Sequence, residues 1–114
     1  MYQAVLKFWF NEIPPQNWWL KDPDFDAVIR ERFGALHRAA YLGECWEWRK
    51  QPHGRLAEII VLDQFPRNCY RDTPLAFASD AMALALAQEA IAGGHDAALA
   101  PMERAFLYLS LIHI

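Results

Sequence analysis

Cysteine is scarce in this sequence, and the two thiols limit the chemistry that the chain can support. Cys45 and Cys69 are too few for a disulfide framework, and their spacing matches no common zinc-ligand pattern. We therefore expect both to be reduced thiols in a cytoplasmic protein. A nucleophilic role for either cysteine would need a base nearby, and the sequence alone does not place one there.

Several catalytic and ligand-binding motifs are also absent. The chain has no GxGxxG, no P-loop and no GxSxG nucleophile motif. Its histidines are scattered, without HExxH or paired-ligand spacing. We therefore expect neither a metal site nor a cofactor.

Positive charge is not in excess. The 11 Lys and Arg residues against 14 Asp and Glu residues give a formal net charge of -3, whereas nucleic-acid-binding domains usually carry clustered positive charge. The N-terminus lacks the basic region and cleavage site of a signal peptide, and no uninterrupted apolar run is long enough to cross a bilayer. The sequence predicts a cytoplasmic protein that binds neither nucleic acid nor membrane.

The composition that is present is typical of a globular domain, because 54% of the residues are hydrophobic and 22% are charged. Apolar residues recur at helical spacing, and no alternating strand pattern of useful length occurs. We predict an all-α fold, with a single domain over residues 1–114 and about five helices packed as antiparallel hairpins. The expected helices cover residues 3–11, 24–42, 54–65, 74–92 and 101–111.

Local signals predict where these helices begin and end. Asp24 is a candidate N-cap for the second helix, and Gly43 suits its end. Pro66 is expected to stop the third helix. Thr73 followed by Pro74 resembles an N-cap with proline at the first helical position. The apolar face of the fourth helix is then expected to consist of Phe77, Ala81, Leu84 and Ile91.

The segment LDQFPRN, at 62–68, places a carboxylate on an apolar helical face. Position 63 follows positions 56, 59 and 60 on one side of the third helix. Asp80 lies beside the apolar face of the fourth helix, and the short connection would bring both carboxylates close to Arg67 and Arg71. Because a buried carboxylate needs a partner, we predict that Asp63 is buried and bonded to Arg67 or Arg71.

Two interpretations remain open for the corner formed by Asp63, Arg67, Asn68, Arg71 and Asp80. In the structural one, Arg67 bonds the last carbonyls of the third helix, Asn68 closes the turn and Arg71 pairs with Asp80. In the functional one, the same polar groups line a pocket for a small molecule or a peptide end. An aromatic wall for that pocket would come from Trp9, Phe10, Trp18 and Trp19.

Four segments carry a resemblance: LDQFPRN, YRDTPLAFASD at 70–80, VLKFWF at 5–10 and PMERAFLY at 101–108. Together they resemble the bacterial domain of unknown function 924 family over most of the chain. The resemblance implies an all-helical fold similar to tetratricopeptide-repeat proteins, and it implies no particular activity. The residues that match the family's pattern, without assigned roles, are Trp9, Asp63, Gln64, Phe65, Pro66, Arg67, Asn68, Arg71 and Asp80.

The C-terminus departs from that pattern, since LSLIHI follows Tyr108 where the family continues with a His-Ser-Glu block and further helices. We therefore expect the chain to be an incomplete N-terminal portion of a longer family domain. A helix over AFLYLSLIHI would be apolar around most of its circumference. The sequence thus predicts self-association or poor solubility through residues 105–114.

Two functions are compatible with these features. The first, which the sequence favours, is a binding module for a peptide, a partner protein or a small polar ligand. Its candidate ligand-binding residues are Trp9, Asp63, Gln64, Arg67, Asn68, Arg71 and Asp80. The second is an enzyme that uses Asp63 or Asp80 as an acid or base, with Arg67 or Arg71 holding an anionic substrate.

Overall fold

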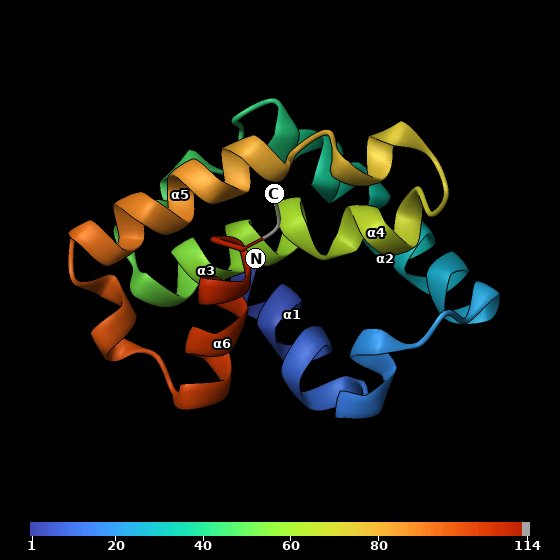
Figure 1. Cartoon of the computed structure of the whole chain (residues 1–114), viewed down its shortest axis with the longest axis horizontal. Coiled ribbons are helices and arrows are strands. Elements are labelled where there is room, and N and C mark those ends of the chain that lie inside the picture. Colours follow the sequence, from blue (N-terminus) through green and yellow to red (C-terminus); the bar gives the residue numbers. More distant parts are fainter. Residues whose placement is uncertain (113–114) are drawn as a thin grey trace.

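The structure is a computed structural model that describes residues 1–112, and these residues form an all-α fold without strands (Figure 1). The all-α prediction is confirmed. The α-helices are α1 (Tyr2–Lys7), α2 (Pro23–Tyr41), α3 (Pro52–Asp63), α4 (Phe65–Cys69), α5 (Asp80–Ala92) and α6 (Pro101–Leu109). A π-helical turn, η1 (Phe8–Glu12), extends α1, and the 3-10 segments are η2 (Pro15–Trp19), η3 (Trp46–Lys50), η4 (Pro74–Phe77) and η5 (His95–Ala98).

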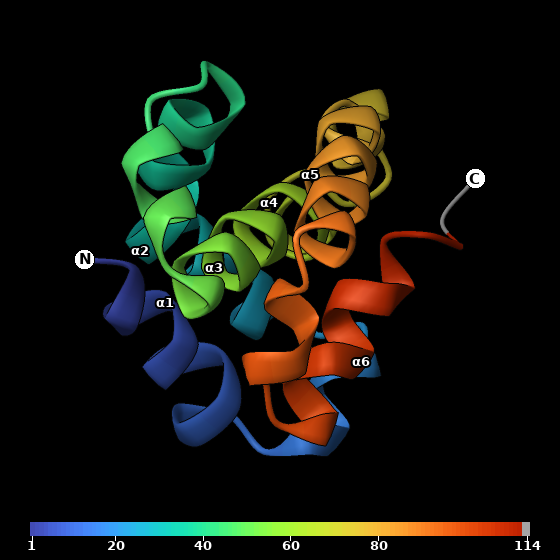
Figure 2. The same cartoon turned by 90° about the vertical axis from the view of Figure 1, so that its left-hand side faces the viewer.

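Helix α3 lies at the centre of the fold, with α1, α2, α5 and α6 packed around it (Figures 1 and 2). Every residue from Leu56 to Asp63 is buried, so the helix has no solvent-facing side over that stretch. The sequence predicted an apolar face at positions 56, 59, 60 and 63, and the structure buries the whole circumference instead. A helix that is buried all round must satisfy every polar group inside the protein.

Glu58 is one such group. Its side chain is fully buried in the middle of α3, and both carboxylate oxygens accept hydrogen bonds from Arg49 of η3, at 2.8 Å each. This bidentate ion pair compensates the buried charge and attaches η3 to the central helix.

The N-cap of α2 lies two residues before the predicted one. Asp22, not Asp24, is the N-cap: its Oδ1 accepts from the backbone N–H groups of Asp24 and Phe25. Pro23 then occupies the first helical position, which suits its fixed φ. The end of the helix agrees with the prediction, because Gly43 adopts a φ of +80° that other residues rarely accept.

The predicted fourth helix is divided in two. Its first turn is the 3-10 segment η4, and α5 begins only at Asp80, after the buried Ser79. The Ser79 hydroxyl donates to the carbonyl of Leu62 at 2.6 Å and lies 3.2 Å from Nε2 of His37. Ser79 therefore fixes the start of α5 against α3 and α2.

The buried face of α5 also differs from the expected one. It consists of Ala83, Leu86, Ala87 and Ala90. Phe77 and Ala81 are exposed, because the break before Asp80 changes the rotation of the helix relative to the core. The alanines let α5 pack closely on α3.

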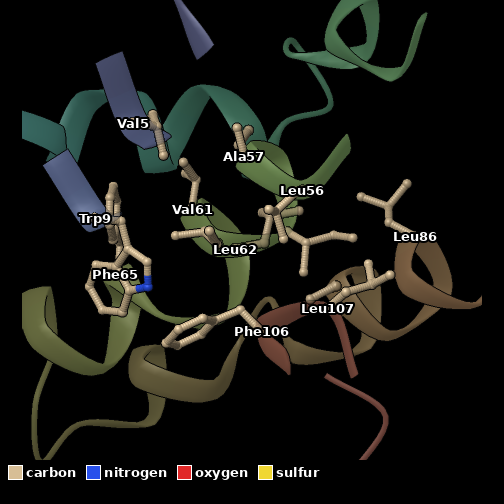
Figure 3. Packing of buried hydrophobic residues seen from close by; sticks show 14 of the residues in the cluster. Val5, Trp9, Leu56, Ala57, Val61, Leu62, Phe65, Leu86, Phe106 and Leu107 are labelled. Atoms are coloured by element: carbon tan, nitrogen blue, oxygen red, sulfur yellow. The ribbon is translucent and has the colours of Figure 1, made fainter. Parts of the chain in front are cut away.

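Aromatic side chains fill the space between η1, α4 and α6. Trp9 and Phe65 lie side by side with Phe106 across from them (Figure 3), with ring centroids of Trp9 at 5.8 Å from Phe65 and 5.6 Å from Phe106. Trp9 is only 1% exposed. It is a core residue.

Helix α6 and the residues after it are partly covered by the rest of the chain. Phe106 and Leu107 are buried, Leu109 and Leu111 pack against the core, and Ile112 is exposed. His113 and Ile114 lie outside the described residues. Self-association through residues 105–114 stays a prediction.

One segment, Pro74–Ala92, is long and apolar enough to cross a membrane by length and composition. Core helices of soluble proteins pass the same test. Here Asp80 interrupts the segment, and α5 packs on α3.

The cytoplasmic location and the likeness to tetratricopeptide repeats stay predictions.

The close approach of η3 to α3 gives a first testable prediction. A Cβ added at Gly54 would lie 2.1 Å from the carbonyl oxygen of Trp48, whereas one added at Gly34, inside α2, would meet nothing nearer than Arg30 Cγ at 3.9 Å. Gly54→Ala should therefore lower the free energy of unfolding by on the order of 2 kcal/mol. The matched Gly34→Ala should raise it by about 0.5–1 kcal/mol. Urea denaturation of both variants checks the pair, and equal effects would contradict this packing.

Candidate functional site

The segment LDQFPRN forms the junction between α3 and α4. Helix α3 ends at Asp63, Gln64 joins the two helices, and α4 begins at Phe65. The sequence had predicted that Pro66 stops a helix. In the structure Pro66 instead lies in the first turn of α4. Proline is tolerated there because the N–H groups of a first turn have no partner within the helix.

Asp63 is buried at this junction, with only 1% of the residue exposed. Its Oδ1 accepts from Arg67 Nη1 at 2.8 Å, and its Oδ2 accepts from Gln64 Nε2 at 3.1 Å and from the Ser110 hydroxyl at 3.0 Å. Arg67 also donates to the carbonyl oxygen of Asp63. The predicted burial of Asp63 and its bond to Arg67 both agree with the structure, whereas Ser110 had not been expected.

Arg67 joins this junction to α5. Its Nη1 and Nη2 donate to the two carboxylate oxygens of Asp80 at 3.2 and 3.0 Å. One guanidinium thus bridges two carboxylates, as the antiparallel arrangement of the two helices had suggested. The guanidinium also lies over the ring of Phe77, 5.2 Å from its centroid, a cation–π contact.

Arg71 has a different partner from the predicted one. It pairs with Asp26 of α2, through Nε at 2.6 Å and Nη2 at 2.9 Å, and not with Asp63 or Asp80. Asn68 donates to the same carboxylate at 2.9 Å. The structural interpretation had paired Arg71 with Asp80, and that pairing is wrong.

Asp26 is the acidic residue that the sequence analysis missed. It is buried on α2. In the sequence, Asp22, Asp24 and Asp26 stand close together, and acidic residues in this arrangement are typical of an exposed helix start. Burial raises the pKa of its carboxyl group, but hydrogen bonds from Arg71 and Asn68 and the charges of Arg71 and Arg30 together lower that pKa below its usual range. Asp26 is therefore a carboxylate at neutral pH.

Four of the predicted ligand-binding residues line one cavity of about 290 Å³, which we name the Trp–Arg cavity. Its polar lining residues are Gln64, Arg67, Asn68 and Arg71, and its apolar lining residues are Trp18, Trp19 and Leu20. A second cavity of about 550 Å³ shares Arg67 and Arg71 with it and extends over Asp72, Thr73, Pro74, Ala76 and Phe77. Neither lining includes Asp63 or Asp80, both of which pair with Arg67, or Asp26, which pairs with Arg71.

The predicted aromatic wall is only half correct. Trp18 and Trp19 line the cavity, but Trp9 and Phe10 do not. Trp9 supports the wall indirectly, because its carbonyl oxygen accepts a hydrogen bond from Trp18 Nε1 at 2.9 Å. Apolar spacing placed Trp9 on the correct helix, but the sequence could not tell a buried aromatic ring from one that lines a pocket.

The two thiols are not suited to nucleophilic chemistry. Burial raises the pKa of Cys69 to about 11, and it also raises the pKa of Cys45. Both are therefore thiols rather than thiolates at neutral pH. Within residues 1–112, no group of three or more His, Cys, Asp or Glu side chains is arranged to hold a metal ion.

The sequence model of a family described as bacterial protein of unknown function (DUF924) matches residues 5–114. The chain belongs to this family. Among solved structures, that of a protein of unknown function from Agrobacterium tumefaciens has a TM-score of 0.93 and 38% identity, covering 99% of this chain and 64% of that one. The DUF924 chain thus spans less than two thirds of that protein. No curated protein matched the sequence.

These comparisons confirm the family that LDQFPRN and its companion segments resembled. The descriptions of the DUF924 family and of the solved structure assign no activity. What the DUF924 chain binds must therefore be argued from its own site.

The burial of Asp63 in the DUF924 fold predicts a large effect on stability. Asp63→Ala removes the acceptor of Arg67, Gln64 and Ser110, and it should cost on the order of 3 kcal/mol of unfolding free energy. Glu12→Ala, which breaks an exposed ion pair with Arg32, should cost less than about 1 kcal/mol. Urea denaturation at pH 7 measures both, and an Asp63 effect below about 0.5 kcal/mol would contradict the burial described above.

The lowered pKa of Asp26 predicts a specific dependence of stability on pH. Because the folded-state pKa lies below the unfolded value of roughly 3.9, the ionised carboxylate stabilises the fold fully above about pH 5 and loses that effect as the pH falls through the folded-state pKa. Asp26→Asn should therefore flatten the acid side of the stability profile.

Unfolding free energies measured between pH 7 and pH 2.5 test this expectation. Asp24→Asn, which removes an exposed carboxylate from the same helix, is the matched control and should retain the wild-type slope. An Asp26→Asn profile as steep as that of the wild type would show that another group causes the acid sensitivity.

Proposed function

We propose that this DUF924 chain is a binding module for a small polar ligand, which occupies the Trp–Arg cavity. The observation that carries the proposal is that four polar side chains, Gln64, Arg67, Asn68 and Arg71, line one cavity together with two tryptophans. Ligand sites commonly combine apolar walls with a few convergent polar groups. Its volume of about 290 Å³ lies just below the usual range for ligand pockets, which begins at about 300 Å³, and favours a small molecule over a peptide.

The hydrogen bonds behind the cavity support binding by making it preorganised. Arg67 is held by two carboxylates and Arg71 by a bidentate pair with Asp26. A side chain that is already fixed loses little conformational entropy when a ligand arrives. The two guanidiniums therefore form a stable polar surface for recognition.

The same arrangement gives less support to acid–base catalysis by Asp63 or Asp80. A general acid or base must come within about 3 Å of the proton that it transfers. Both carboxylates are directed at Arg67, and neither lines the two cavities that the arginines border. Their geometry fits residues that position the arginines.

Heteronuclear NMR with a library of small polar compounds tests the proposal. Ligands should shift the amide signals of residues 18–20 and 64–71, and Arg71→Lys should weaken their binding at least tenfold. Lysine keeps the charge but loses the bidentate pair with Asp26 and the planar set of donors. Circular dichroism shows whether the Arg71→Lys variant remains folded.

Arg32→Lys is the matched control, since Arg32 is an ion-paired surface arginine that does not line the cavity. Its variant should bind as the wild type does. Signals that shift only outside residues 18–20 and 64–71, or a library without any binder, would overturn the proposed function.

A further inference from the structure

The charges around the Trp–Arg cavity are already balanced before a ligand arrives. Arg67 pairs with Asp63 and Asp80, and Arg71 pairs with Asp26. Three carboxylates against two guanidiniums give this cluster a formal charge of -1. Arg30, whose charge also acts on Asp26, brings the sum to zero. Asp72, whose charge acts on Arg71, is itself paired with Lys21 and leaves that sum unchanged. Such a site does not attract a dianion strongly, although it still offers directed hydrogen bonds.

The hydrogen-bonding groups that remain are of both kinds. Arg71 uses Nε and Nη2 for Asp26, and its Nη1 has no acceptor within residues 1–112. The amide nitrogens of Gln64 and Asn68 donate to Asp63 and Asp26, so the amide oxygens of these two cavity-lining residues are left to accept. A ligand that complements the cavity therefore needs an acceptor for the guanidinium and an N–H or O–H donor.

The apolar side of the cavity offers a flat and supported ring. Trp19 is 65% exposed, yet its ring is stacked on Phe106 at a centroid distance of 5.9 Å and an interplanar angle of 10°. Trp18 meets Trp19 edge to face at 6.5 Å and is itself held by its bond to the Trp9 carbonyl. Exposed tryptophans that neighbouring rings hold in place present a planar surface on which another aromatic ring can stack.

We infer that the ligand class of this cavity is a small aromatic monocarboxylate with a hydroxyl or ring N–H group. This inference rests on the proposed function and narrows it. The single negative charge suits the neutralised cluster, the carboxylate oxygens accept from Arg71, and the donor group meets Gln64 or Asn68. The ring stacks on the tryptophan wall.

Titrations of the wild-type chain at pH 7.5, followed by calorimetry, test the inference with four probes. 4-Hydroxyphenylacetate and indole-3-acetate carry all the expected features, acetate lacks the ring, and phenyl phosphate carries the ring with a largely dianionic group at this pH. We expect at least one of the two aryl acetates to bind at least tenfold more tightly than both acetate and phenyl phosphate.

Two tryptophan variants supply the matched comparison. Trp19→Ala should weaken binding of the aryl acetates at least tenfold. Trp46→Ala should leave it unchanged, because Trp46 is similarly exposed, at 55%, but does not line the cavity. Both side chains are largely exposed, but Trp19 also covers the buried Phe106. Circular dichroism and urea denaturation of both variants therefore show whether a loss of binding has occurred in a folded chain.

The outcomes separate this inference from the function on which it rests. The ligand class is wrong if phenyl phosphate binds more tightly than the aryl acetates. It is also wrong if Trp19→Ala has no effect on binding while polar compounds still shift the amide signals of residues 64–71. In both cases the cavity remains a binding site. If no probe and no library compound shifts those residues, both are overturned.

Discussion

Each charged side chain of a helix that is buried on every side needs a partner inside the protein. This constraint determines how the elements around α3 are arranged. Helix α3 has Glu58 in its middle and Asp63 at its end, and both are almost completely buried. Their partners come from different parts of the chain: Arg49 from η3, Arg67 from α4 and Ser110 from the end of α6. Because an unpaired buried carboxylate is so costly, these contacts fix where the surrounding elements lie.

The site follows from the same constraint. The carboxylates behind the cavity, Asp63 and Asp26, are almost fully buried, whereas Arg67 and Arg71 are partly exposed and line it. The carboxylates hold the guanidiniums in place. In the proposed function, stabilisation and recognition are divided between these two kinds of group, because the remaining guanidinium N–H groups bind the ligand. Loss of either carboxylate would affect the shape of the cavity as well as the stability of the fold.

The sequence was sufficient for the all-α fold and for the burial of Asp63, because helical spacing determines which side chains share a face. It left Arg67 and Arg71 as alternative partners of Asp63, and the structure shows Arg67, four residues further along the chain. It was insufficient for Asp26, since a carboxylate in the first turn of a helix is common at the surface and its contact with Arg71 spans 45 positions. Pro66 was read as a helix stop because proline has the same local signature at the start of the next helix. In each of these misses a long-range contact, or a junction between two helices, decided the outcome.

A double-mutant cycle on Asp63 and Arg67 tests most directly whether their pair holds this corner together. Asp63→Asn, Arg67→Met and the combined variant would be compared with the wild type by urea denaturation at pH 7. We expect a coupling energy of at least about 2 kcal/mol, since the two groups are in contact and Asp63 is buried. A coupling below about 0.5 kcal/mol, with the two single effects simply adding, would contradict it.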